Sequence, residues 1–82
     1  MNSRNFNYLS HVECVLRVVS EWGEPVPKSE IAILCNLSHA YAMGLLDGLV
    51  VAGLVAYEYP EPSRYVLVSI TEAGLELLEK SE

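Results

Sequence analysis

Residues 28–53, with the sequence KSEIAILCNLSHAYAMGLLDGLVVAG, decide the fold of this chain. Two apolar runs lie on either side of Asn36, a residue type that tolerates the left-handed backbone conformation of a tight turn between helices. Ser38 stands directly before the second run, where its side chain can cap a helix N-terminus. The stretch therefore predicts two helices, over residues 28–35 and 38–52, joined as a helix-turn-helix unit.

A further helix is predicted upstream, over residues 10–22. Its apolar side chains recur at intervals of three and four residues, which is the spacing of one helical face; they are Leu9, Val12, Val15, Leu16, Val19 and Trp22. Ser10 is the expected N-cap, and Glu13 follows it at the spacing of a capping box. Residues 1–8 are expected to form an N-terminal arm.

The hydrophobic period changes after Gly53. Residues 54–59 and 65–70 are rich in β-branched and aromatic side chains and predict two strands, separated by a Pro-rich turn. Thr71 is the expected N-cap of a last helix over residues 71–81. The chain, residues 1–82, is thus predicted to be a single α+β domain, mainly helical, with a three-helix core, a two-stranded wing and a final helix.

Composition limits the function classes. Hydrophobic residues make up 51% of the chain, which is enough for a globular core, and the formal net charge of −6 argues against binding polyanions through bulk electrostatics. A local basic patch is still compatible with that charge. The N-terminus lacks the apolar segment of a signal peptide, the apolar run over residues 45–57 is too short to span a bilayer, and two cysteines suit a reducing compartment. We expect a soluble cytoplasmic protein with no membrane partner.

Several short motifs follow one another in a specific order: Glu30-Ile31-Ala32, Leu37-Ser38, Leu49 ahead of Gly53-Leu54-Val55, Tyr65-x-Leu67 and Thr71-x-x-Gly74. With the order of elements, they make about residues 9–81 resemble the winged helix-turn-helix domain of bacterial and archaeal transcription regulators of the MarR and PadR type. The resemblance implies a homodimer that binds duplex DNA, with the third helix in the major groove and the wing on the adjacent backbone.

The resemblance assigns candidate nucleic-acid contacts to this chain: Lys28, Ser29, Ser38, His39, Tyr41, Met43 and Arg64. Lys28 and Ser29 start the second helix, where helix termini commonly meet phosphates, and Arg64 lies at the predicted wing tip. Residues 38–53 depart from the family pattern, because they contain no Arg, Lys, Asn or Gln to read base edges and they place Asp47 where phosphate is expected.

A row of small residues indicates a second kind of partner. Ala40, Gly44, Gly48 and Ala52 recur at four-residue spacing, and a glycine inside a helix costs about 1 kcal/mol relative to alanine. Such a row is typical of close approach by another backbone, or of packing inside the chain. The candidate interface residues are Phe6, Tyr8, Ile33, Leu34, Ala40, Gly44 and Gly48. The alternative function is therefore a winged-helix protein-interaction module that does not bind DNA.

The sequence disfavours three other classes of site. His11, Cys14, Cys35 and His39 have the ligand types of a zinc site, but Cys35 occupies a core position of the family pattern and His39 is expected to point outward. A redox-sensing Cys14–Cys35 pair is the other minor alternative. The sequence has neither a phosphate-binding glycine loop nor a nucleophile elbow. We therefore predict no enzyme activity, no metal and no cofactor.

Overall fold

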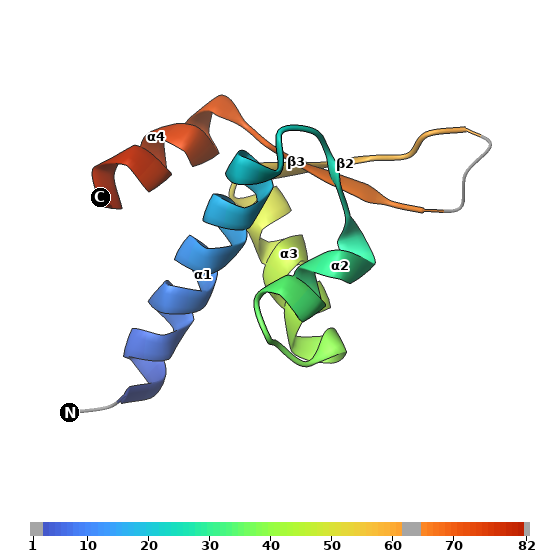
Figure 1. Cartoon of the computed structure of the whole chain (residues 1–82). Helices are drawn as coiled ribbons and strands as arrows, with labels where there is room; N and C mark the ends of the chain where they lie inside the picture. The colour runs from blue at the N-terminus through green and yellow to red at the C-terminus, as the bar shows by residue number, and fades with distance from the viewer. Residues whose placement is uncertain (1–2, 62–64, 82) are drawn as a thin grey trace.

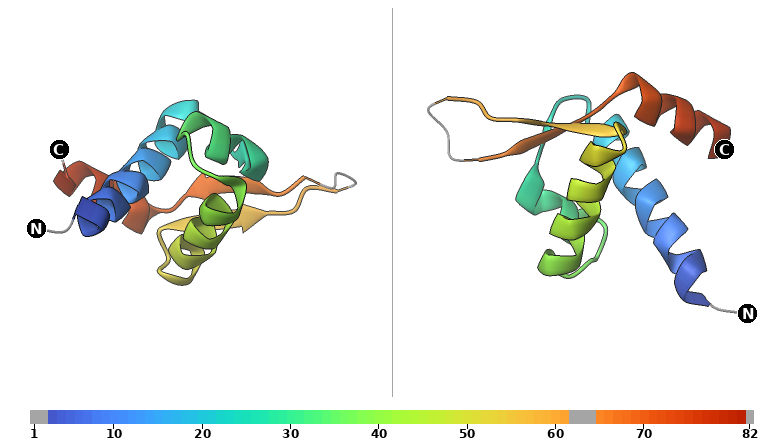
Figure 2. Two further views of the ribbon diagram at one scale, coloured as in Figure 1. Left: turned by 90° about the horizontal axis from the view of Figure 1, so that it is seen from below. Right: turned by 180° about the vertical axis from the view of Figure 1, so that it is seen from behind.

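The protein is described here by a computed structural model, which covers residues 3–61 and 65–81, with the side chains of residues 8–61 and 65–80. The elements in chain order are α1 (Ser3–Trp22), β1 (Val26–Pro27), α2 (Lys28–Leu34), α3 (His39–Val51), β2 (Val55–Glu58), β3 (Leu67–Ile70) and α4 (Glu72–Ser81). They form the predicted winged helix-turn-helix, a mainly helical α+β fold in which the wing and α4 extend from opposite sides of the body (Figures 1 and 2).

Helix α1 is longer than predicted. It begins at Ser3, so residues 3–9 are helical instead of forming an arm, and the expected start at Ser10 is wrong. Residues 1–2 of the expected arm lie outside the described residues. A serine at capping-box spacing is a weak local signal, and a helix can continue through such a residue at small cost because propensities differ by only tenths of a kcal/mol. The N-terminal half of α1 consequently projects beyond the other helices (Figure 1).

The helix-turn-helix forms close to its predicted bounds. Asn36 has the expected left-handed conformation, with φ of 55°, and the Leu37 amide donates to the Ala32 carbonyl over 2.8 Å. Ser38 caps α3, because its Oγ accepts from the Tyr41 amide at 3.3 Å. The side chains of α3 that were predicted to face the core are buried: Ala42, Leu45, Leu46 and Leu49.

The wing belongs to a three-stranded antiparallel sheet with strand order β1-β3-β2. Strand β1 was not predicted, because it is only two residues long and contains a proline, so no strand pattern can be recognised in it. Val26 pairs with Val68, and the Lys28 amide donates to the Val66 carbonyl at 2.8 Å. This pairing fixes the start of α2 against the base of the wing.

One core unites all the elements. Its most deeply buried side chains come from α1, β1, α2, α3, β2 and β3; they are Val15, Leu16, Val26, Ile31, Leu46, Val55 and Val68. Thr71 is the N-cap of α4, as predicted, since its Oγ1 accepts a hydrogen bond from the Gly74 amide at 3.1 Å.

No single helix among the described residues is long and apolar enough to cross a bilayer, although α2 and α3 together, bent by 117°, reach that length and composition.

Candidate nucleic-acid interface

A hollow of about 210 Å³ lies between the start of α2, the exposed side of α3 and the wing. We call it the wing-side hollow, and its lining residues are Lys28, Ser29, His39, Met43, Tyr65 and Val66. Strand β1 positions Lys28 and Ser29, while His39 and Met43 are one helical turn apart on α3 and so lie on the same face. The fold thus brings together four predicted contact residues that come from two different helices.

Lys28 does not present a free charge in this hollow. Its Nζ lies 3.6 Å from Oδ1 of Asp47 and 4.4 Å from the ring centroid of Tyr57, and the Tyr57 hydroxyl donates to the same Asp47 oxygen at 2.5 Å. The bond from Tyr57 and the charge of Lys28 lower the pKa of Asp47, whereas burial and the bond to Asp47 raise the pKa of Tyr57. Asp47 therefore stays ionised and offsets the charge of Lys28.

Tyr57 is the member of this cluster that sequence inspection missed. Its place in strand β2 was predicted, but the alternation of a short strand does not show which helix a side chain reaches. The pairing of β2 with β3, which sets Tyr57 opposite Val68, aims the phenol at α3. The signal that the sequence offers is a tyrosine in a wing strand that follows a helix with one acidic residue, Asp47.

The remaining predicted contacts lie elsewhere. Ser38 uses its hydroxyl to cap α3, so that group already has a partner. Tyr41 faces α1, where its hydroxyl lies 2.9 Å from Nδ1 of His11 and the two rings meet edge to face at 5.3 Å. Arg64 lies outside the described residues. The structure therefore gathers part of the predicted set in one place and sets Tyr41 on the other side of α3.

The small residues of α3 line a second hollow, of about 310 Å³, which we call the glycine-side hollow. It is bounded by Tyr8, Ala40, Tyr41, Gly44, Leu45 and Gly48. A Cβ atom added to Gly44 or Gly48 would meet nothing within 4 Å. The row is therefore open to the outside and does not serve packing within the chain.

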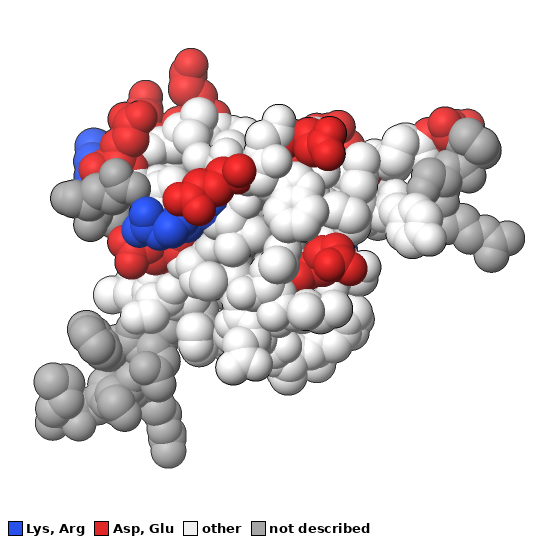
Figure 3. All heavy atoms as spheres, in the orientation of Figure 1, with Lys and Arg blue, Asp and Glu red and all other residues white. Residues whose placement is uncertain are grey.

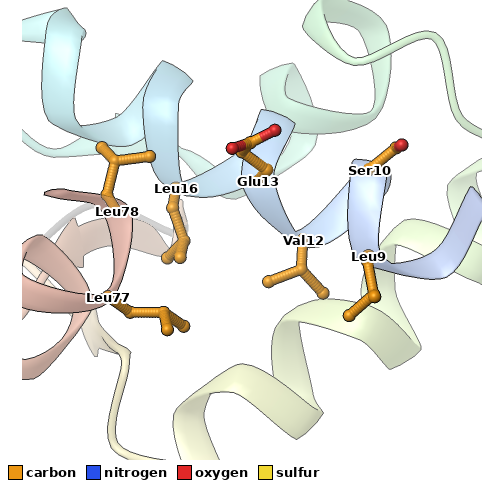
Figure 4. A pocket seen from close by; sticks show the side chains of 7 residues that line it. All are labelled: Leu9, Ser10, Val12, Glu13, Leu16, Leu77 and Leu78. Atoms are coloured by element: carbon orange, nitrogen blue, oxygen red, sulfur yellow. The ribbon is translucent and has the colours of Figure 1, made fainter. Parts of the chain in front are cut away.

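Other predicted interface residues are also exposed. Ile33 and Leu34 on α2 have 71% and 43% of their surface exposed, and Tyr8 on α1 has 50%. The side chain of Phe6 lies outside the described ones. A third hollow, of about 380 Å³, separates α1 from α4, and Val12 and Leu16 of α1 project into it with Leu77 of α4 (Figure 4).

The candidate zinc ligands are not brought together. Cys14 and Cys35 are in contact, with the Cys14 thiol donating to Cys35 Sγ at 2.8 Å, but His11 turns to Tyr41 and His39 lines the wing-side hollow. Across residues 3–61 and 65–81, no group of three His, Cys, Asp or Glu side chains is placed to hold a metal ion. The cysteine pair therefore stands by itself.

Charge is unevenly distributed over the visible face of the molecule. In Figure 3 the basic atoms lie over the side of α1 and α4, whereas the surface over α2 and α3 is mostly uncharged with isolated acidic groups. Arg17 on α1 pairs with Glu13 at 3.5 Å. On the face that Figure 3 shows, the surface over α2 and α3 thus carries acidic groups and no visible Lys or Arg atoms.

Comparison with known proteins gives relatives by structure and not by sequence. No protein-family model matches the chain, and no curated protein matches its sequence. The transcriptional regulator BldR from Sulfolobus solfataricus is 25% identical with a TM-score of 0.78, covering 88% of this chain and 51% of its own. ZitR, a zinc-responsive MarR family member from Lactococcus lactis, is 23% identical with a TM-score of 0.77, covering 88% and 49%.

A complex of Staphylococcus aureus MepR with DNA is also similar, with 16% identity and a TM-score of 0.80, covering 96% of this chain and 65% of MepR. The chain thus spans about half to two thirds of the length of the regulators it matches. Its fold is a winged helix of the MarR type, as the sequence motifs predicted.

Proposed function

We propose that this chain is the DNA-binding part of a transcription regulator and that it acts as a homodimer on duplex DNA. The observation that carries the proposal is the wing-side hollow, which places Lys28, Ser29, His39 and Met43 next to the wing. The likeness to MepR, whose structure was solved with DNA, extends over 96% of this chain and supports the same function.

In the proposed complex, α3 enters the major groove and the wing lies on the adjacent backbone. His39 and Met43 then face base edges, and the start of α2 brings Lys28 and Ser29 to phosphates. Ser38, Arg64 and Tyr41 remain predicted contacts. Tyr41 reaches DNA only if it gives up its hydrogen bond to His11.

Binding then requires an exchange of partners at Lys28. Its ammonium group leaves Asp47 for a phosphate oxygen, and Asp47 stays behind as a negative charge on α3 held by Tyr57. The proposal therefore predicts weak affinity for nonspecific DNA with a shallow salt dependence, because few Lys or Arg side chains displace counterions from the DNA phosphates.

The test is a titration of duplex DNA at increasing salt, comparing Lys28→Ala with Lys80→Ala. Both variants lose one positive charge, but Lys80 lies on α4, away from the wing-side hollow. We expect Lys28→Ala to reduce the slope of log affinity against log salt by about 1 and Lys80→Ala to leave it unchanged. Equal slopes for the two variants, or no binding by the native chain at about 50 mM salt, would refute the proposal.

The proposed homodimer forms through the hollow between α1 and α4. Leu9 is 66% exposed there and Leu77 is 39% exposed, beside the inward-facing Val12 and Leu16. Two copies of this apolar surface can cover each other around a two-fold axis. We expect Leu9→Glu to give monomers in sedimentation at micromolar concentration, and Ile33→Glu, which alters an apolar residue 71% exposed on α2, to stay dimeric.

The alternative, a protein-interaction module, is favoured by one observation: Gly44 and Gly48 have open space where a side chain would stand. A partner helix can approach α3 closely there. Gly44→Arg should abolish capture of such a partner, because the arginine side chain fills the open space beside the helix. Unchanged capture by Gly44→Arg, or binding of duplex DNA by the native chain, would remove this alternative.

A further inference from the structure

Cys14 and Cys35 form a pair that neither DNA binding nor dimerisation uses. Cys14 lies in the middle of α1, and Cys35 is the C-cap of α2, directly before the turn of the helix-turn-helix. Their sulfur atoms are 2.8 Å apart although the residues are 21 positions apart in the chain. Both side chains are partly exposed, so a small reagent can reach them.

The surroundings of the pair exclude a shared metal site among the described residues. No third His, Cys, Asp or Glu is placed with these two to complete a coordination sphere. Packing does not require two thiols here either, since Cys35 contacts the core only as a partly buried neighbour. What distinguishes the pair is the direct contact between two oxidisable sulfur atoms that belong to different helices.

We propose that Cys14 and Cys35 are a thiol–disulfide switch, oxidised by a low-molecular-weight disulfide such as oxidised glutathione, that reversibly ties α1 to the turn of the helix-turn-helix. Disulfides in reducing compartments are usually transient and redox-sensing, which suits such a pair. The proposal does not depend on whether the chain binds DNA.

The order of the two exchange steps follows from the environment of the pair. Burial, followed by the hydrogen bond from Cys14, raises the pKa of Cys35 to about 12, so Cys35 stays protonated at neutral pH. Since the thiolate is the attacking species, the first attack comes from Cys14. The Cys14 thiolate attacks one sulfur of the small disulfide, which forms a mixed disulfide and releases one small thiolate.

In the mixed disulfide Cys14 no longer donates a hydrogen bond to Cys35, and the small thiolate released in the first step takes the proton of Cys35. The Cys35 thiolate then attacks the Cys14 sulfur of the mixed disulfide and displaces the second small thiolate. Both protein thiols have lost their protons to the two released thiols, and the pair has given two electrons to the small disulfide. The reverse sequence with a small thiol restores the reduced pair. Because the two sulfur atoms are already in contact, the second step competes well with the attack of another molecule.

Oxidation closes a covalent loop between Cys14 and Cys35. A crosslink over a loop of this length removes freedom from the unfolded chain, and it joins the longest helix to the residue that precedes the tight turn at Asn36. The oxidised chain should therefore resist unfolding more than the reduced chain, with α2 held in the position that the structure shows.

The experiment treats the native chain with excess oxidised glutathione and then with dithiothreitol. Free thiols are counted by alkylation and mass spectrometry, and thermal unfolding is followed by circular dichroism. We expect both thiols to disappear in a monomeric or dimeric chain with no covalent link between copies, at a rate that does not depend on protein concentration. The midpoint of unfolding should rise by roughly 10 °C and return after reduction.

The matched controls are Cys14→Ser and Cys35→Ser, each of which retains one thiol because the chain has only two cysteines. Neither variant can form the internal link, so neither should show a redox-dependent midpoint. Cys35→Ser should still collect glutathione on Cys14, which tests the order of attack. The proposal is overturned if the native chain retains two alkylatable thiols, if it forms disulfides only between copies, or if its midpoint responds no more than those of the variants.

Discussion

The two hollows on either side of α3 differ in chemistry although they share one helix. The wing-side hollow is lined by an ammonium group, a hydroxyl and an imidazole, with the Asp47–Tyr57 pair at its edge. The glycine-side hollow has a floor of Gly44 and Gly48 and a wall of two tyrosines, Tyr8 and Tyr41. The first suits phosphates and base edges, whereas the second suits the close approach of another polypeptide.

This difference shows that α3 presents two surfaces of different chemistry on different sides of the helix. Residues four apart share a face, so His39 and Met43 lie with Asp47, while Ala40 lies with Gly44 and Gly48. A third face, that of the leucines, anchors the helix in the core.

Removing the anchor should have the greatest consequence. Leu46 is fully buried, so Leu46→Ala should lower the free energy of unfolding by about 2–5 kcal/mol through lost burial and the cavity that it leaves. Val51 lies on the same helix and is 89% exposed, so Val51→Ala should change it by less than about 0.5 kcal/mol. Urea denaturation measures both values, and similar losses would show that α3 is not anchored by one face.

Glycines inside and outside the core should respond with opposite signs. A Cβ at Gly74 would collide with the Leu54 carbonyl oxygen and lie 2.8 Å from Cγ1 of Ile70, so Gly74→Ala should cost about 1–3 kcal/mol. Gly48→Ala adds a methyl group in open space and should stabilise the helix by up to about 1 kcal/mol. Thermal unfolding distinguishes them. If Gly48→Ala destabilised the chain, the glycine row would already pack against another part of the molecule.

Removing the charge of Asp47 should strengthen binding on the wing side. Asp47→Asn frees Lys28 from its acidic partner and removes a negative charge from α3, so the affinity for DNA at constant salt should rise by up to about fivefold. The slope of log affinity against log salt should stay that of the native chain, because Lys28 contacts phosphate in both. Tyr57→Phe removes only the hydroxyl bond and keeps both charges, so its affinity should match that of the native chain. Fluorescence polarisation measures these affinities, and an unchanged affinity in Asp47→Asn would show that Lys28 does not contact DNA.

The smallest effect concerns acid. Because Tyr57 and Lys28 lower the pKa of Asp47 in the folded chain, this carboxylate stabilises the fold above its unfolded value of 3.8. The contribution is lost as the pH falls below that value through the folded pKa. The difference in unfolding midpoint between the native chain and Asp47→Asn should therefore be constant near neutral pH and shrink at acid pH. A difference in unfolding midpoint that grows at acid pH would contradict the lowered pKa of Asp47.

Much of the fold could be predicted from the sequence because its signals are local. The capping serine at Ser38, the left-handed Asn36 and the leucine spacing of α3 each act within a few residues. Strand β1 and the extension of α1 to Ser3 could not be predicted, since β1 exists only through its pairing with β3, and α1 passes through the cap signal at Ser10.

The candidate site was predictable in its residues and not in its contacts. Lys28, Ser29, His39 and Met43 were identified from their positions on two helices, and the tertiary fold brings them to one hollow. The bond of Tyr57 to Asp47 and that of Tyr41 to His11 join residues 10 and 30 positions apart. Such contacts depend on how helices and strands pack against one another. Hydrophobic periodicity and capping residues are local signals and do not predict this packing.

The division of α3 into two faces is tested most directly by nuclear magnetic resonance of the ¹⁵N-labelled chain titrated with duplex DNA at low salt. We expect the largest amide shifts at Lys28, Ser29, His39 and Met43, with little change at Gly48 or along α4. Shifts concentrated at Gly44 and Gly48, or no shifts anywhere in the spectrum, would contradict it.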